Sequence, residues 1–217
     1  MTTKEISVPF IGKLENCSWE DLVTALQQQG AWDRVESVNW PDNFPYRPDM
    51  KFRIARSETA LVVYYSVKGA DLRAVALKDG GKVWEDSCCE FFVEAADGRY
   101  WNFEMNCIGT LLAGCGTGRA GRVNLSPEET AKIRRFSTLP HESCMEIGGS
   151  YAWKAAVVIP FALLGYDPEH LPSSIRANFY KCGDCTAHPH FLSWNPIDTP
   201  SPDFHRPEFF GTLKLAE

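Results

Sequence analysis

The chain has 217 residues, of which 44% are hydrophobic and 12% aromatic, and its formal net charge is -6 at pH 7. This composition predicts a folded domain with a substantial core, not a disordered chain. The acidic balance leaves no basic stripe to neutralise phosphates, so it argues against nucleic acid and anionic membranes as partners and favours a neutral ligand.

The N-terminal sequence and the cysteines set expectations about compartment. No window approaches the roughly 18 apolar residues of a membrane helix. The first residues, MTTKEISVPFIGKLENC, lack the basic start and apolar stretch of a signal peptide. We therefore expect a cytoplasmic protein as the sequence stands, or a secreted one if a leader has been removed. The chain is long for a disulfide scaffold and Cys88 adjoins Cys89, so most of its eight cysteines should be free, buried thiols.

Two segments carry helix signals. Residues 18–29 (SWEDLVTALQQQ) begin with a serine N-cap, continue with an acid three positions later and apolar residues at helical spacing, and are followed by Gly30. Residues 126–136 (SPEETAKIRRF) combine a capping serine, a proline at the first helical position and Glu129, which completes a capping box. Both patterns predict short helices.

Most other segments are typical of strands. Residues 50–69 (MKFRIARSETALVVYYSVKG) predict two extended runs about a polar turn, and YAWKAAVVIPF, IRANFYKCG, HFLSWNPI and FFGTLKL continue the series between Gly, Pro, Asn and Asp. Many short strands with two short peripheral helices indicate a mainly β protein, an antiparallel β-sandwich. No internal repeat or linker divides the chain, so we expect one domain over 1–217, with 1–48 as an N-terminal extension.

A predicted hairpin through AADG places acids on a sheet surface. Strand side chains alternate between faces. In CCEFFVE (88–94) and YWNFEMNC (100–107), one face is apolar, and the other joins Glu90 and Glu104 with Asn102 and Asn106. This polar surface is either a solvated outer face, the usual arrangement in antiparallel sheets, or a binding site.

Two tryptophans favour a binding site. Trp84 precedes the acidic strand, and Trp194 lies in a loop rich in prolines, which either forms a ligand wall or packs over a sheet edge. Sugars stack their C–H faces on indoles, while their hydroxyls need acceptors and amides in fixed geometry. The remaining tryptophans are expected in the core: Trp19, Trp32, Trp40, Trp101 and Trp153.

Several blocks of sequence together resemble the carbohydrate-binding module family 9-like domains, which are related to DOMON domains. In chain order they are VWEDSCCEFFVE, YWNFEMNCIGTLLA, WKAAVVIPFALLG, NFYKCGD and HFLSWNPIDTPSPDFHRPEFFGTLKL, and the similarity runs from about residue 50 to the end. The resemblance implies an immunoglobulin-like or jelly-roll sandwich, non-catalytic binding of a mono- or oligosaccharide, and often structural calcium. The chain departs from secreted members by its many cysteines and by lacking a visible signal and a catalytic module.

The resemblance also implies site residues. Trp84 and Trp194 correspond to two stacking indoles, and Glu90 to the acid that binds sugar hydroxyls. Polar neighbours in this interpretation are Asn102, Glu104, Arg176 and Asn178. Calcium, expected from the resemblance alone, could be bound by acids in EDS (85–87) and DTPSPD (198–203).

Other functions remain open at this stage. Glu90 and Glu104 on neighbouring strands could approach the roughly 5 Å separation of a retaining glycosidase. Related sandwich domains hold haem through Met and His, here Met105 and His190, although Met105 falls on the apolar face. Apolar positions on exposed strands could equally serve a protein partner.

Two further motifs are weaker. CGDCTAHPH offers Cys182, Cys185, His188 and His190 at metal-like spacing but lacks a second knuckle. GTGRAG (116–121) matches a dinucleotide fingerprint literally, yet an extended RVNLS follows it where that site needs a helix. We expect a loop there, and no nucleotide.

Overall fold

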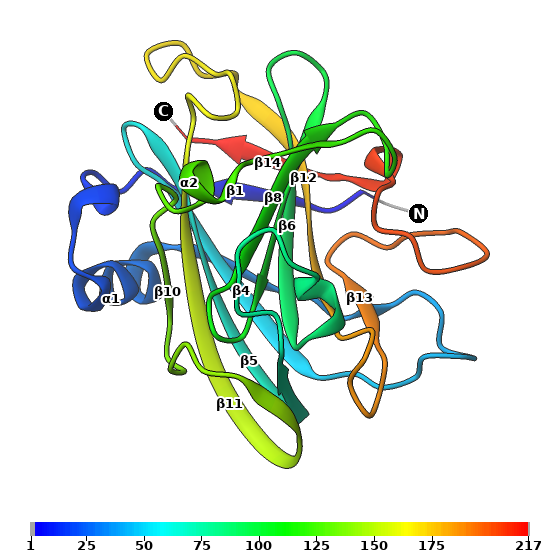
Figure 1. Ribbon diagram of the computed structural model, residues 1–217. Helices are drawn as coiled ribbons and strands as arrows, with labels where there is room; N and C mark the ends of the chain where they lie inside the picture. The colour runs from blue at the N-terminus through cyan, green and yellow to red at the C-terminus, as the bar shows by residue number, and fades with distance from the viewer. Residues whose placement is uncertain (1–2, 217) are drawn as a thin grey trace.

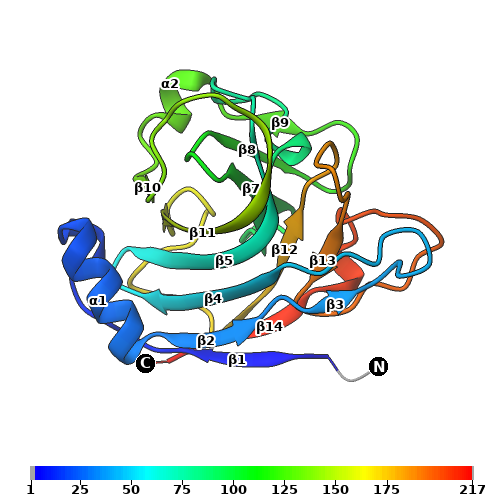
Figure 2. The same ribbon diagram turned by 90° about the horizontal axis from the view of Figure 1, so that it is seen from below.

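The computed structural model describes residues 3–216 and is a β-sandwich, as predicted. Two sheets face each other, and α1 (Trp19–Gln29) lies against the outer face of the smaller one (Figures 1 and 2). Within these residues the strand pairs are antiparallel except for the parallel pair of β1 and β14.

The larger sheet has the strand order β1-β14-β12-β6-β7-β8-β9, and β13 pairs with both β12 and β3. Its strands are β1 (Glu5–Val8), β3 (Ser37–Val38), β6 (Cys88–Glu94), β7 (Tyr100–Asn106), β8 (Leu111–Gly116), β9 (Val123–Asn124), β12 (Ser174–Cys182), β13 (Phe191–Ser193) and β14 (Gly211–Leu215).

The smaller sheet has the order β10-β11-β5-β4-β2. Its strands are β2 (Ala31–Arg34), β4 (Asp49–Arg56), β5 (Ala60–Ala74), β10 (Arg135–Ser137) and β11 (Cys144–Pro160). The polar turn predicted between β4 and β5 is present, and Ser57 closes it because its backbone N–H donates to the carbonyl of Ala60.

The main core lies between the two sheets. Phe52 of β4 stacks on Phe179 of β12 with ring centroids 3.7 Å apart, and Phe91 of β6 packs on Phe179 at 4.7 Å. The apolar face of the predicted hairpin therefore supplies this core, as the alternation of β6 and β7 requires. A second cluster joins Leu22 and Leu26 of α1 to the outer face of the smaller sheet.

The helix that begins at Ser126 is shorter than its sequence predicts. Ser126 and Glu129 form the expected capping box, but α2 covers only Pro127–Thr130. Ile133 is buried in the core, and residues 135–137 pair with β11 as strand β10. The extra sheet pairing and this apolar contact override the helical pattern of residues 131–136.

The burial of the tryptophans differs in part from the prediction. Trp40 and Trp153 are buried as expected, and Trp19 and Trp101 are partly buried against core clusters. Trp32 was expected in the core but is 54% exposed on the edge strand β2. An edge strand has one face and one side open to solvent, so its indole needs no partner there.

The eight cysteines are all free, and most are buried as predicted. Among the described residues, no helix combines the length and apolar character needed to cross a membrane.

Candidate functional site

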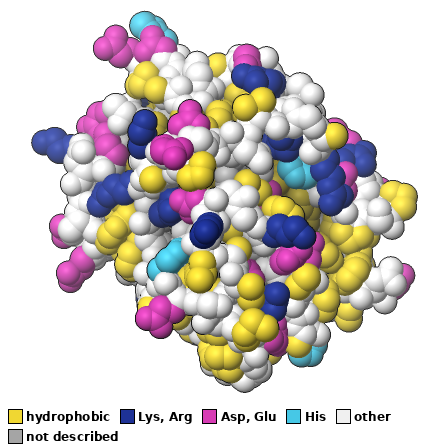
Figure 3. All heavy atoms as spheres, in the orientation of Figure 1, with side chains coloured by type: hydrophobic (Ala, Val, Ile, Leu, Met, Phe, Trp, Pro, Cys, Tyr) yellow, Lys and Arg dark blue, Asp and Glu magenta, His cyan; other side chains and the backbone are white. Residues whose placement is uncertain are grey.

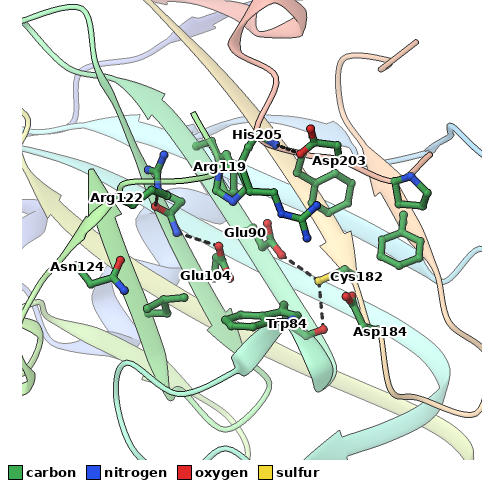
Figure 4. Close-up of a pocket in the computed structure, with 16 residues that line it drawn as sticks. Trp84, Glu90, Glu104, Arg119, Arg122, Asn124, Cys182, Asp184, Asp203 and His205 are labelled. Atoms are coloured by element: carbon green, nitrogen blue, oxygen red, sulfur yellow. Dashed lines mark hydrogen bonds between the residues drawn. The ribbon is translucent and has the colours of Figure 1, made fainter. Parts of the chain in front are cut away.

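A pocket of about 530 Å³ opens on the outer face of the larger sheet. Its floor comes from β6, β7, β8 and β12, and its walls come from the turn at Val83–Glu85 and the loops at 116–122 and 202–205 (Figure 4). The lining residues are Trp84, Glu90, Phe92, Asn102, Glu104, Leu112, Arg119, Arg122, Asn124, Cys182, Asp184, Phe191, Pro202, Asp203, Phe204 and His205. Four of the seven predicted site residues are therefore brought together: Trp84, Glu90, Asn102 and Glu104.

The floor is built by the register of the hairpin. Glu90 pairs with Glu104 across β6 and β7, and both side chains point to the outer face. Asn102 lies two residues before Glu104 on the same face, and its amide Nδ2 donates to Glu104 Oε1 at 2.8 Å. All three are at least 95% buried, so the floor presents polar groups in fixed positions within an enclosed site. Asn106 shares this face but donates to Asp86 and the carbonyl of Ala76 outside the pocket.

Arg122 fixes the far side of the floor. Its Nε donates to Asn102 Oδ1 at 2.9 Å, and its other nitrogens donate to the carbonyls of Tyr100, Gly114 and Gly118. The guanidinium also lies 4.4 Å from the Tyr100 ring centroid. An arginine held by this many acceptors is a positioning group, because few of its donors remain for a ligand.

The two arginines of the pocket were missed from the sequence. Arg119 lies within the glycine-rich loop that literally matches a dinucleotide fingerprint, and Arg122 follows it directly. The loop instead joins β8 to β9, and the predicted absence of a following helix is confirmed. A basic residue in a loop next to an acidic sheet face was the available signal.

Trp84 is held beside the floor by two short turns that pair with each other. The backbone N–H of Asp184 donates to the carbonyl of Trp84 at 3.0 Å, and that of Cys185 donates to the carbonyl of Glu85. Cys182 Sγ lies 3.6 Å from the same Trp84 carbonyl. The indole is half-buried, so part of its surface remains available to the pocket.

The second aromatic wall comes from Phe204 and Phe191, which the sequence analysis did not identify. Phe204 stacks on Tyr180 with centroids 4.2 Å apart and planes at 8°, and the Tyr180 hydroxyl donates to the Phe204 carbonyl. Phe191 meets the Phe204 ring edge-on. The proline-rich loop thus both packs on the sheet and forms a pocket wall, so the two interpretations of this loop are compatible.

Trp194, predicted as the second stacking indole, lies in the core. It is fully buried, it packs edge-on against Phe52 and Phe179, and its Nε1 donates to Asp33 Oδ2 at 2.7 Å. The indole lies so close to Gly211 that a Cβ there would come within 2.4 Å of it. The prediction was wrong because Trp194, directly after β13, packs against Phe52 of the facing sheet.

Arg176 and Asn178 also lie outside the pocket. The Arg176 guanidinium donates to the carbonyls of Glu208 and Phe210, and the Asn178 amide donates to those of Asn195 and Phe209. Both side chains anchor the C-terminal loop to β12, so their predicted role as polar neighbours of the ligand is wrong. They act on the site only through that loop.

Burial shifts the titration of the pocket. Desolvation and the nearby Cys182 and Glu104 raise the pKa of Glu90 well above its usual range. Desolvation raises the pKa of Glu104 to about 7, although the Asn102 amide and Arg122 oppose the shift. The pKa of Asp184 rises to about 6 for the same reason. Desolvation lowers the pKa of His205 to about 3, so this imidazole is neutral near pH 7.

Asp86, in the EDS segment predicted to bind calcium, does not fit a cation site. Asp86 accepts hydrogen bonds from the backbone of Val75 and Ala76 and from the Asn106 amide, and it lies 3.5 Å from Arg73. N–H donors occupy the oxygens that a hard cation would need. The EDS segment is therefore a structural anchor.

The haem and compact metal interpretations do not fit either. Met105 is buried between the sheets, and both imidazole nitrogens of His190 are engaged, with Lys181 and with the carbonyl of His188. His188 pairs with Asp71, and Cys185 is exposed. The ligands proposed from CGDCTAHPH are thus directed to separate partners.

Charge is mixed in the pocket, whose lining includes two arginines and four acidic residues. On the face shown in Figure 3, acidic and basic side chains are interspersed among apolar ones. This pattern suits a neutral ligand better than a polyanion.

Comparison with known proteins gives one family. The family model described as carbohydrate-binding family 9 matches residues 20–215. A crystal structure of a putative carbohydrate-binding protein from Bacteroides uniformis is 38% identical, with a TM-score of 0.90 over 99% of this chain and 100% of that one. No curated protein matches the chain.

More distant structures share the fold. A family 9 carbohydrate-binding module from Caldicellulosiruptor kristjanssonii in complex with glucose is 12% identical, with a TM-score of 0.61 over 98% of this chain and 96% of that one. Its complex with cellotriose aligns at 11% identity with a TM-score of 0.58, over 98% and 93% of the two chains.

Proposed function

This chain belongs to carbohydrate-binding family 9, and from that premise we propose that it binds a neutral glucose-type sugar non-covalently in the pocket between Trp84 and Phe204. The two Caldicellulosiruptor kristjanssonii structures are complexes with glucose and with cellotriose, which supports sugars of this type for the present chain. A mono- or short oligosaccharide matches the pocket, because cavities of about 300 to 1,000 Å³ suit small molecules.

A single arrangement carries the proposal: aromatic walls flank a buried polar floor. Trp84 lies in the turn at Val83–Glu85 and Phe204 lies in the loop at 202–205, and both side chains line the pocket. Glu90, Asn102 and Glu104 lie between them on the sheet. A pyranose has this dual character, with apolar C–H faces and hydroxyls around its edge.

The floor groups differ in what they offer a sugar. The Asn102 amide is already committed to Glu104 and Arg122, so it holds Glu104 in place. Among residues 3–216, the only hydrogen bond to the Glu90 carboxyl group comes from the Cys182 thiol, at 3.0 Å, and the only one to the Glu104 carboxyl group comes from Asn102. Glu90 and Glu104 therefore both keep capacity for a sugar hydroxyl.

The same geometry favours binding over hydrolysis. A glycosidase places its two carboxyl groups on either side of the scissile bond. Glu90 and Glu104 are direct neighbours in register on adjacent strands of one sheet, so both lie on the same side of any ligand. Side-by-side acids suit hydroxyl recognition better than protonation and attack from opposite directions.

Calorimetric titration tests the proposal. Glucose and cellotriose are titrated separately into the wild-type chain, Trp84→Ala and Trp32→Ala. We expect saturable binding by the wild type and a Kd about 30-fold higher in Trp84→Ala, because a central aromatic contact is worth about 2 kcal/mol.

Trp32→Ala is the matched control, since this indole is exposed on β2 and does not line the pocket. It should bind sugar as the wild type does. Absence of binding to both sugars, or equal losses in the two tryptophan variants, would overturn the proposal. Thermal unfolding of each variant shows whether the fold is retained.

A further inference from the structure

Two thiols and a carboxyl group meet at one end of the pocket floor. Cys88 of β6 pairs directly with Cys182 of β12, and Glu90 follows two residues later on the same face as Cys88. One ligand atom from each of these three residues lies within 4.8 Å of the other two. Figure 4 shows Cys182 between Glu90 and the carbonyl of Trp84.

The Glu90 carboxyl group of this cluster has no basic partner among the described residues. Within residues 3–216 the Glu90 carboxyl group takes part in no ion pair. Lys181 is next in sequence to Cys182, but strand alternation sends it to the other face, where its Nζ bonds to His190. Burial raises the pKa of Cys88 to about 12 and that of Cys182 well above its usual range, so alone these groups keep their protons.

We propose that Cys88 Sγ, Cys182 Sγ and the Glu90 carboxylate form a binding site for a thiophilic divalent cation of the zinc type. Binding releases the two thiol protons and the carboxyl proton to solvent, and no oxidation occurs. Thiolates select soft or borderline cations, so calcium and magnesium are excluded as occupants.

The separations suit tetrahedral coordination. With Zn–S near 2.3 Å and Zn–O near 2.1 Å, ligand atoms lie about 3.6 to 3.8 Å apart. The three atoms fall within 4.8 Å of one another, and Cys182 Sγ is 3.0 Å from Glu90 Oε1, so movements below about 1 Å bring them to these values.

This site differs from a closed structural zinc site because it is reached from the pocket and leaves one coordination position open. Glu90 and Cys182 line the pocket, whereas Cys88 lies behind them, so the ion enters through the pocket. Three protein ligands leave a fourth position, which a water molecule from the pocket fills. The inference concerns metal binding by itself and does not depend on sugar recognition.

Titration of the reduced chain with Cd²⁺ tests the site, because Cd²⁺ bound to thiolates gives an ultraviolet charge-transfer band. We expect one Cd²⁺ per chain and a band that corresponds to two thiolates. Cys88→Ser and Cys182→Ser should each halve the band and weaken binding at least tenfold. Cys185→Ser, the control at an exposed thiol outside the pocket, should leave both unchanged.

A second measurement needs no substitution. X-ray absorption of the wild-type chain with one equivalent of Zn²⁺ should give two sulfur neighbours near 2.3 Å and lighter neighbours near 2.0 to 2.1 Å. A first shell without sulfur, or with three or more sulfurs, would refute the proposal. The proposal would also be refuted by a Cd²⁺ band that disappears in Cys185→Ser, or by one that keeps its full intensity in both Cys88→Ser and Cys182→Ser.

Discussion

The outer faces of the two sheets are covered in different ways. On the smaller sheet, Ala55 and Val62 meet Leu22 and Leu26 of α1 in a continuous apolar contact. On the larger sheet, the C-terminal loop packs on Tyr180 through Phe204 but leaves Glu90 and its neighbours facing a pocket. Strand alternation creates an outer face in both cases, and the covering segment decides whether that face becomes core or site.

The two covers also differ in energetics. The helix buries apolar side chains and contributes to stability through the area removed from water. The pocket floor holds carboxyl groups whose desolvation opposes folding unless a partner compensates. We therefore expect substitutions beneath α1 to change stability alone, and substitutions in the pocket floor to change ligand affinity first.

Leu26→Ala should give the largest effect. Leu26 is fully buried on the side of α1 that faces the sheet, and truncation of a buried leucine costs about 2 to 5 kcal/mol. Urea unfolding measures the loss, with Gln28→Ala on the exposed side of the same helix as a control that stays within about 0.5 kcal/mol. Sugar affinity should be unchanged, and a parallel loss of affinity would break the separation between the two faces.

Gly114→Ala should act on the pocket side. A Cβ at this position would come within 2.3 Å of Asn124 Oδ1 and 3.2 Å of Asn102 Oδ1, so both side chains must shift. We expect the Kd for cellotriose to rise about tenfold, or about 1.4 kcal/mol.

Gly118→Ala is the control for this change, because Gly118 lies nearby in the loop after β8 and a Cβ there has no neighbour within 4 Å. Calorimetry on both variants gives the comparison. An equal affinity in Gly114→Ala and the wild type would mean that the Asn102 side of the floor does not contact sugar.

His205 should add a small pH dependence to stability. Its pKa is lowered from 6.5 to about 3 in the fold, so the unfolded chain binds the proton more tightly. The stabilising contribution is present above pH 6.5 and is lost as the pH falls toward 3. Between pH 7 and 6 the wild type should lose about 0.7 kcal/mol from this group.

Urea unfolding at several pH values measures this slope in the wild type and in His205→Gln, and the difference between the two slopes gives the contribution of His205. A slope in His205→Gln equal to that of the wild type would contradict the assigned titration.

The sequence predicts most of what depends on local pattern. The alternation in residues 88–107 predicts the hairpin and the shared face of Glu90, Asn102 and Glu104. Ser18 and Ser126 correctly predict two helix starts. These features follow from chain geometry over a few residues.

The remaining features depend on contacts between distant segments. Trp194 lies in the core because its indole bonds to Asp33 and packs against Gly211. Both residues are distant from Trp194 in sequence. Phe204 supplies the second wall because Tyr180 stacks with it. A pattern within one loop does not reveal which of its aromatic side chains faces the ligand, so Trp194 was the wrong choice.

The central claim is that sugar lies against Trp84. The indole N–H signals of ¹⁵N-labelled protein can be followed during a cellotriose titration, with the Trp84 signal assigned from its loss in Trp84→Phe. We predict that the Trp84 signal shifts in a saturable manner while the signals of buried Trp194 and exposed Trp32 stay in place. Saturable shifts at Trp32, with the Trp84 signal unmoved, would contradict this account.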